Sequence, residues 1–230
     1  AGWEVERTHA APSDAVDTAR YIPEFLRASF PRGWPVMLDE GHHYGLLHRL
    51  DVPSSGLLLA AKTYEAYYDL LLQLSAGALG REYVVLCRGW MPSQRQQAQA
   101  PVSWTPGDSR PSAVRRGGKV AVSRLRVLAH AVHGGEAFSL VGISIDTGRR
   151  HQIRVHCAHL GFPTVCDGKY TSVASLAVDL AWCPRNFLHR CRLAFADGAG
   201  AAREATAALP EDLREALAGL RPGCAASAAA

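Results

Sequence analysis

Residues 48–62 read HRLDVPSSGLLLAAK and place an arginine and an aspartate between two apolar runs. Arg49 and Asp51 occupy alternate positions just ahead of a Pro-Ser-Ser-Gly turn. Side chains two residues apart in an extended segment point to the same side, so both are expected to face one cleft. By itself, an aspartate before such a turn is more typical of a turn cap than of a catalytic carboxylate. Residues 57–61 then predict a short apolar strand.

The composition indicates one globular domain. The chain has 230 residues, 48% hydrophobic and 20% charged, enough to bury a sizeable core but too few for several full domains. No apolar run approaches the roughly 20 residues that span a bilayer, and the first residues lack the basic-then-apolar order of a signal peptide. We expect a soluble intracellular protein of the cytoplasm or an organelle. The sequence begins at Ala1 rather than at a methionine, so an upstream segment stays open.

The six cysteines lie far apart and form no Cys-x-x-Cys pair, which favours a reducing compartment over a disulfide scaffold. Residues 151–166, HQIRVHCAHLGFPTVC, do gather three histidines and two cysteines. A metal-dependent hydrolase is therefore one alternative interpretation. Zinc sites need compact, recurrent ligand spacing, however, and arginines interleaved with these histidines would repel a cation. We predict no metal.

Basic residues are concentrated in residues 110–126, a stretch that holds no acidic residue. The net charge of the whole chain is only +4, which is mild for a nucleic-acid binder. The stretch is a candidate phosphate-facing surface, although a solvated loop explains it equally well when it is taken alone. Its basic residues are Arg110, Arg115, Arg116, Lys119, Arg124 and Arg126.

Hydrophobic periodicity predicts elements in the first half of the chain. Residues 1–45 are punctuated by proline and glycine, and we expect them to be irregular. Thr63 is a candidate N-cap for an amphipathic helix. The i, i+3, i+4, i+7 spacing of that helix is carried by Tyr67, Leu70, Leu71 and Leu74. Residues 81–89 predict a strand, and residues 91–118 a long polar loop.

The second half predicts a β-hairpin and two helices. Residues 124–129 alternate apolar and basic side chains, and a His-Gly-Gly turn joins them to a second strand at residues 136–146. One helix is expected from about His151 and another after Pro210. Their buried sides are expected to carry Ile153, Cys157 and Leu160, and Leu213, Leu217 and Leu220. Because hairpins outnumber crossovers, we predict an α+β fold whose central sheet is mixed, mainly antiparallel and flanked by helices.

Several segments, in order, resemble the RluA family of RNA pseudouridine synthases. HRLDVPSSGLLLAAK is similar to the family's HRLDxxTSG stretch, and REYVVLCRG to its K-x-Y segment. GGKVAVSRLRVL resembles its GK-x-A-x-T strand, and DTGRRHQIRVHCAHLGFPTVCDGKY its TGRxHQIRxH segment with the glycine and aspartate that follow. FLHRCRLAF and LPEDL match its closing pattern. The resemblance covers residues 46–220 and implies a pseudouridine synthase-like fold with a central RNA-binding cleft.

This resemblance sets the expected organisation of the chain. The catalytic domain is placed at residues 46–222, after an irregular segment at residues 1–45, and residues 223–230 are expected to be a disordered tail. The sequence departs from the family pattern mildly at Ser54, Ser123 and Arg81, where threonine, threonine and lysine are usual. The family's usual lysine-proline strand and its S4 RNA-binding domain are not recognisable, which leaves substrate choice open.

The resemblance also implies roles for individual residues. Asp51 matches the catalytic aspartate, Arg154 the arginine that pairs with it, and Tyr83 the tyrosine that packs on the target base. Arg49 matches the arginine that helps hold the flipped nucleotide. The remaining expected substrate-binding residues are Arg149, His151, Gln152, Arg115 and Arg116. Isomerisation of uridine has no net redox change and no external reactant, so no cofactor is expected.

The expected partner is structured RNA, ribosomal or transfer. We expect no membrane association, no obligate protein partner and a monomer. A catalytically inactive RNA-binding protein of the same fold is the main alternative, motivated by the atypical N-terminal segment and the basic stretch. An enzyme is favoured because a binder has no chemical need to keep Asp51, Tyr83 and Arg154 together.

Overall fold

A β-sheet forms the centre of the structure, a computed structural model that describes residues 3–4, 20–30, 34–105 and 110–223. Its strands follow the spatial order β11-β10-β4-β9-β8-β12, while β3 pairs with β10 and β5 with β8. They are β3 Ser55–Gly56, β4 Gly80–Arg88, β5 Gln97–Gln99, β8 Val122–His133, β9 Glu136–Ile145, β10 Leu188–Ala196, β11 Ala202–Thr206 and β12 Arg221–Pro222. Among these described strands only β3 pairs in parallel, so the predicted mixed, mainly antiparallel sheet is confirmed.

The predicted hairpin is formed by β8 and β9, and its turn explains the glycine pair. His133 pairs with Glu136 across a two-residue turn. Gly134 and Gly135 both have positive φ, +57° and +83°. A tight turn with two left-handed residues matches the twist of the flanking strands, and glycine adopts it without steric strain.

Both faces of the sheet are covered by helices. Alternate residues of β4 point to opposite faces, so neighbouring residues of this strand belong to different clusters. Val85 belongs to a buried cluster with Ile153 of helix α3, Gln152–His159. Leu86 belongs to another cluster with Leu213 of helix α5, Glu211–Ala218. The two clusters are the main hydrophobic core, and they fix α3 on one face and α5 on the other.

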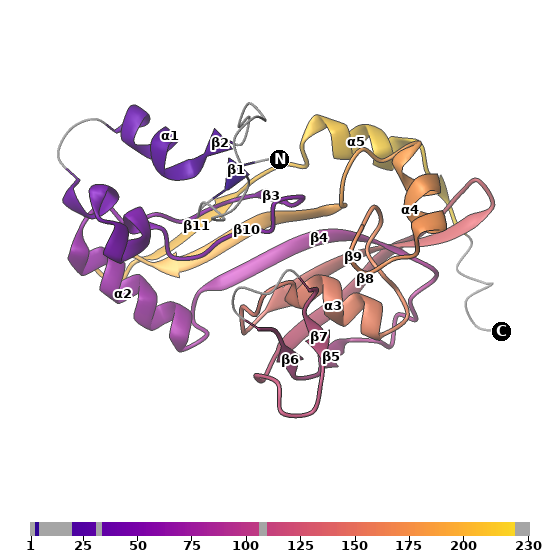
Figure 1. Ribbon diagram of the computed structural model, residues 1–230, viewed down its shortest axis with the longest axis horizontal. Helices are drawn as coiled ribbons and strands as arrows, with labels where there is room; N and C mark the ends of the chain where they lie inside the picture. Colours follow the sequence, from indigo (N-terminus) through magenta and orange to yellow (C-terminus); the bar gives the residue numbers. More distant parts are fainter. Residues whose placement is uncertain (1–2, 5–19, 31–33, 106–109, 224–230) are drawn as a thin grey trace.

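The three helices predicted from spacing are confirmed. Helix α2, Tyr64–Ser75, begins where the Thr63 hydroxyl accepts a hydrogen bond from the Ala66 N–H, at 3.2 Å. Helix α3 buries Ile153 and Cys157 with Leu160, and α5 follows Pro210 and packs with Leu213, Leu217 and Leu220. Figure 1 shows α2 toward one end of the sheet and α5 toward the other.

The structure contains two helices that sequence patterns did not predict. Helix α4, Val173–Leu180, is capped by the Ser172 hydroxyl. Helix α1, Ile22–Ser29, lies within the segment predicted to be irregular, together with β1 Trp3–Glu4, β2 Arg20–Tyr21 and the 3₁₀ helices η1 Pro35–Leu38 and η2 Glu40–Gly45. The prolines of this segment indicate irregular structure when only the sequence is considered. Proline is also favoured in the first turn of a helix, so its presence does not exclude these short elements.

Two local predictions are wrong. Residues 57–61 form no strand beyond a single bridge between Leu46 and Ala60, and residues 91–118 contain β5 and a small hairpin of β6, Val102–Ser103, with β7, Ala113–Val114. On α2, Leu71 is 40% exposed rather than buried in the core. The predicted disordered tail lies outside the described residues apart from Gly223. No helix in the described part of the chain is long and apolar enough to cross a membrane.

Candidate active site

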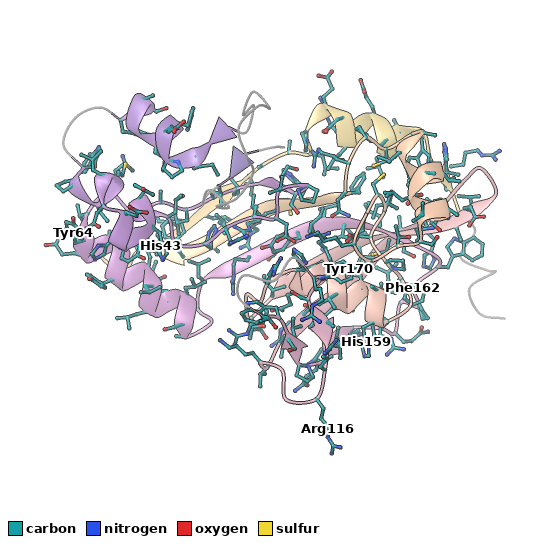
Figure 2. All side chains as sticks on the ribbon, in the orientation of Figure 1. His43, Tyr64, Arg116, His159, Phe162 and Tyr170 are labelled. Atoms are coloured by element: carbon teal, nitrogen blue, oxygen red, sulfur yellow. The ribbon has the colours of Figure 1, made fainter. Side chains whose placement is uncertain are left out.

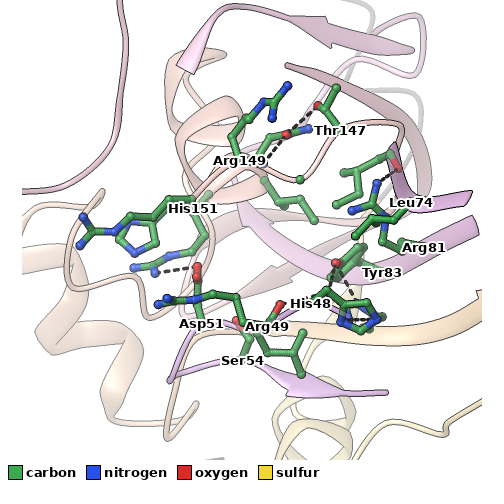
Figure 3. A pocket seen from close by; sticks show the side chains of 18 of the residues that line it. His48, Arg49, Asp51, Ser54, Leu74, Arg81, Tyr83, Thr147, Arg149 and His151 are labelled. Carbon is green, nitrogen blue, oxygen red and sulfur yellow. Dashed lines mark hydrogen bonds and ion pairs between the residues drawn. The ribbon is translucent and has the colours of Figure 1, made fainter. Parts of the chain in front are cut away.

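A cavity of about 570 Å³ opens between segments that are far apart in the sequence. Its walls come from residues 47–51, the end of α2, the start of β4, residues 145–154 and β10. Figure 3 shows Arg49 and Asp51 on one wall, Arg149 and His151 on another, and Tyr83 and Arg81 on a third. The shared cleft that alternation predicted for Arg49 and Asp51 is therefore present.

The loop that carries Asp51 is fixed by a turn and by a glycine. The Ser54 N–H donates to the Asp51 carbonyl oxygen at 2.8 Å, which closes the turn. Gly56 then has a φ of +121°, and a Cβ there would lie 2.3 Å from the backbone oxygen of Arg190. Only glycine allows β3 to approach β10 this closely.

Arg154 pairs with Asp51 from the opposite wall, across 103 residues of sequence. Its Nη1 donates to Asp51 Oδ2 at 3.1 Å. The Arg154 side chain is 3% exposed and the Asp51 side chain 17% exposed. The pairing predicted for these two residues is therefore present, with the aspartate on the solvent side of it.

A second aspartate, Asp167, holds the other side of the Arg154 guanidinium. Arg154 Nε donates to Asp167 Oδ2 at 2.8 Å, and Nη2 donates to Oδ1 at 2.6 Å. Asp167 also accepts from the Thr164 hydroxyl at 3.0 Å and from the Lys169 N–H at 3.0 Å. This bidentate pairing fixes the plane of the guanidinium, so that its Nη1 is directed at Asp51.

Electrostatics favour the charged form of both buried partners. Burial opposes ionisation of Asp167, but the hydrogen bonds and the charge of Arg154 lower its pKa overall. Burial likewise opposes the charge of Arg154, yet Asp167 and Asp51 raise its pKa overall. In the sequence, Asp167 is only one residue of the family-like segment, and no role was predicted for it.

Tyr83 lines the same cavity and is held by Arg190, which sequence reasoning missed. The two residues face each other across β4 and β10. Arg190 Nε and Nη2 donate to Tyr83 Oη at 2.8 and 2.6 Å, and the guanidinium carbon lies 5.0 Å from the ring centroid. Tyr83 is 5% exposed, so the ring is packed into the wall of the cavity.

Arg190 also ties this wall to the loop that carries Asp51. Its Nη1 donates to His48 Nδ1 at 2.7 Å and to the Leu57 carbonyl at 3.0 Å. Burial, followed by the charges of Arg190 and Arg81, lowers the pKa of His48 well below its usual value. An arginine cannot accept a hydrogen bond, so the neutral His48 offers the lone pair of Nδ1 to Arg190.

His151 caps α3 in a left-handed conformation, with a φ of +55°. Its Nδ1 donates to Tyr170 Oη at 2.9 Å, and the Tyr170 hydroxyl donates to the Ser112 carbonyl at 2.9 Å. Burial is the largest influence that lowers the pKa of His151, to about 4, with Asp51 acting in the opposite direction. The ring is therefore neutral at pH 7, with its second nitrogen available as an acceptor.

The other predicted substrate-binding residues divide into two groups. Arg49, Arg149 and Gln152 line the cavity, but Gln152 uses its amide within the protein, accepting from Thr147 and donating to the Val122 carbonyl. Arg115 and Arg116 do not line it. They are exposed in the turn between β7 and β8, where Figure 2 shows Arg116 projecting away from the body of the protein.

The histidine-cysteine cluster does not converge on one point. His156 Nδ1 bonds the Ser123 hydroxyl at 2.9 Å, and Nε2 bonds the Ala100 carbonyl at 2.9 Å. Among the described residues, no group of three or more histidine, cysteine, aspartate or glutamate side chains is arranged to hold a metal ion. The histidines and cysteines of residues 151–166 therefore form no such group within the described residues.

Comparison with known proteins places these features in a family. A family model described as RNA pseudouridylate synthase matches residues 29–159. Ribosomal large subunit pseudouridine synthase D of Xanthomonas campestris is 34% identical over 193 residues, which cover 80% of this chain and 57% of that protein. An uncharacterised RNA pseudouridine synthase of Bacillus subtilis is 34% identical over 178 residues, covering 77% and 56%. The chain thus spans little more than half the length of these relatives.

A solved structure shares the fold. Human RNA pseudouridylate synthase domain containing 1 superimposes with a TM-score of 0.71 at 25% sequence identity, over 88% of this chain and 79% of that one. Human RNA pseudouridylate synthase domain containing 4 gives 0.59 at 21% identity, over 77% of each chain. The predicted fold class is confirmed by these similarities together with the observed sheet.

Proposed function

We propose that this chain, which belongs to the RNA pseudouridylate synthase family, isomerises uridine to pseudouridine in structured RNA. In that reaction the bond between N1 of uracil and C1′ of ribose breaks, the base turns in place, and C5 bonds to C1′ instead. C5 gives up its proton and N1 takes one, so atoms and charge balance without another reactant. No cofactor enters the proposal.

The observation that carries the proposal is the ion-pair chain from Asp167 through Arg154 to Asp51. A buried arginine oriented by one aspartate donates from its Nη1 to a second aspartate in the wall of a cavity. The ionised carboxylate is the nucleophilic form of an aspartate, and the hydrogen bond from Arg154 fixes its position. We assign Asp51 as the nucleophile, and Arg154 as the group that holds it in place.

The other walls suit a flipped nucleotide. The Tyr83 ring, fixed by Arg190, offers an aromatic face for the uracil. Arg49 and Arg149 line the cavity and supply positive charge for the phosphates on either side of the target. His151 is neutral at pH 7 and adds a hydrogen-bond acceptor without adding charge.

We propose ribosomal RNA as the first substrate to test, with transfer RNA second. Several relatives, including those of Xanthomonas campestris and Pseudomonas aeruginosa, are named ribosomal large subunit pseudouridine synthase D. In our proposal, the basic residues of the stretch 110–126 contact RNA beyond the target nucleotide, because Arg115 and Arg116 lie outside the cavity. A monomer is sufficient for this arrangement, since all the named side chains come from one chain.

The test combines a product assay with a binding assay. Pseudouridines are mapped in cellular RNA with and without the protein, and the purified chain is then incubated with the RNA that changes. We expect one or more uridines to be converted only when the protein is present. Binding of ribosomal and transfer RNA without any conversion would overturn the proposal and favour the alternative, an RNA-binding protein without activity.

A further inference from the structure

Two side-chain polar atoms of residues that line the cavity, Ser54 Oγ and Arg81 Nε, are buried without a hydrogen-bond partner. Five such atoms occur among the described residues, namely Ser54 Oγ, Arg81 Nε, Ser112 Oγ, Trp182 Nε1 and Asn186 Oδ1. Only Ser54 and Arg81 among these line the cavity. Buried polar groups in native proteins are almost always paired, so an unpaired one in a binding cavity points to a partner in the ligand.

The position of Ser54 places its hydroxyl in the same turn as the proposed nucleophile. Its N–H donates to the Asp51 carbonyl at 2.8 Å, and the residue is 6% exposed. Figure 3 shows Ser54 beside Asp51 and Arg49 on the same wall. Asp51 and Ser54 together also line a second, smaller cavity of about 470 Å³ on the side of α1, so they form the partition between the two spaces.

The next residue shows what a paired serine looks like in this loop. Ser55 Oγ bonds His189 Nδ1 at 2.9 Å and accepts from Arg185 Nη2 at 3.1 Å. Ser55 therefore joins the loop to the rest of the fold, whereas the Ser54 hydroxyl makes no such bond to any described residue. The difference argues against a purely structural role for the Ser54 hydroxyl.

We propose that Ser54 Oγ binds the ribose 2′-hydroxyl of the target nucleotide and thereby selects RNA over DNA. This inference rests on the proposed function. The isomerisation breaks and remakes a bond at C1′, so the ribose lies against Asp51, and the 2′-hydroxyl is attached to the neighbouring carbon. A serine hydroxyl both donates and accepts, as the 2′-hydroxyl does, and that group is what distinguishes RNA from DNA.

The test crosses enzyme variants with substrate variants. Affinity is measured by fluorescence anisotropy for labelled oligouridylate of five nucleotides and for the same length of oligodeoxyuridylate. Asp51→Asn is the background, so that no turnover interferes. We expect this protein to prefer the ribose form, and the added substitution Ser54→Ala to reduce that preference roughly tenfold, because the 2′-hydroxyl is then left unpaired. Ser54→Thr, which keeps the hydroxyl, should retain the preference.

Stability separates this role from a structural one. Removing a hydroxyl that has no partner in the folded protein should leave the melting temperature of Ser54→Ala unchanged or higher. Ser55→Ala is the matched control, since it loses two hydrogen bonds and should melt earlier while keeping the ribose preference. An equal loss of affinity for both oligonucleotides in Ser54→Ala, or no loss for either, overturns the inference.

The two proposals can fail separately. If pseudouridine is formed but Ser54→Ala keeps the full ribose preference, only the role of Ser54 is wrong. If no RNA is modified but the preference depends on Ser54, the cavity binds ribonucleotides without performing the proposed reaction.

Discussion

Asp51 and Asp167 both pair with Arg154 but differ in burial. Replacement by asparagine should therefore reduce stability at position 167 and activity at position 51. Asp167 is 0% exposed and accepts two hydrogen bonds from Arg154, whereas Asp51 is 17% exposed and accepts one. We expect Asp167→Asn to destabilise the fold. We expect Asp51→Asn to remove activity while leaving the fold and the RNA affinity nearly intact, because the side chain loses its charge but hardly changes in size.

The magnitudes follow from the buried charge. Removing one partner of a buried ion pair costs about 3–5 kcal/mol, since the other charge stays buried without compensation. An asparagine at position 167 would also turn an NH₂ group toward one of the two Arg154 donors. At about 2–4 °C per kcal/mol for a chain of this size, Asp167→Asn should lower the melting temperature by about 6–20 °C. Asp51→Asn should change it by less than about 4 °C, because Asp51 is partly hydrated.

The assay measures stability and chemistry on the same preparations. Thermal unfolding is followed by circular dichroism, and turnover by release of tritium from RNA labelled at C5 of uridine. Glu204→Gln is a control, because it breaks an ion pair with Arg192 in which the two side chains are 50% and 34% exposed. It should change neither readout appreciably. The reasoning is refuted if Asp167→Asn melts within about 2 °C of the unmodified protein, or if Asp51→Asn retains substantial turnover.

Three further predictions concern pH, salt and the tyrosine wall. Burial lowers the pKa of His151 from 6.5 to about 4 in the folded protein. The stabilising contribution of the neutral ring to the free energy of unfolding is therefore fully present above pH 6.5 and is lost as the pH falls toward 4. Chemical denaturation across that range should show that His151→Asn loses less free energy of unfolding on acidification than the unmodified protein does. The difference should be at most about 3 kcal/mol. Replacing Arg115 and Arg116 with glutamine should reduce the salt dependence of RNA affinity, by about 0.7 log units per log unit of salt for each single-strand phosphate that is no longer neutralised, and raise KM without changing kcat. An unchanged slope would remove the loop from the RNA path. Arg190→Met should lower kcat, because the Tyr83 hydroxyl loses the two N–H groups that hold it, and it should lower the melting temperature as well; activity equal to that of the unmodified protein would show that the arginine does not position the ring.

Local sequence patterns were sufficient for the elements whose periodicity is strong. The helices after Thr63, His151 and Pro210 and the hairpin at Gly134 follow from 3.6-residue spacing, alternation and turn chemistry, all of which act within a few residues. The weak elements were missed for the same reason. Helix α4 is short, and its Val173, Val178 and Leu180 are exposed, so they give no clean amphipathic signal.

The residues of the candidate site also divide into those that the sequence indicated and those that only the structure revealed. The sequence, through its family resemblance, named Asp51, Tyr83 and Arg154, and the fold does bring these three to one cavity. It could not reveal which side chains hold them, because those contacts depend on strand register. Arg190 reaches Tyr83 across 107 residues, only because β10 and β4 pair in one particular alignment.

Composition was least informative about where charge and hydroxyl groups lie. Arg115 and Arg116 carry the basic signal of the sequence, yet they stand outside the cavity, whereas Ser54, whose buried hydroxyl is unpaired, is one of the residues that line it. A sequence records which groups can form hydrogen bonds, and local propensity records which elements they lie in. Whether a given group is paired, buried or exposed is decided by contacts between distant segments, and only the tertiary structure determines those contacts.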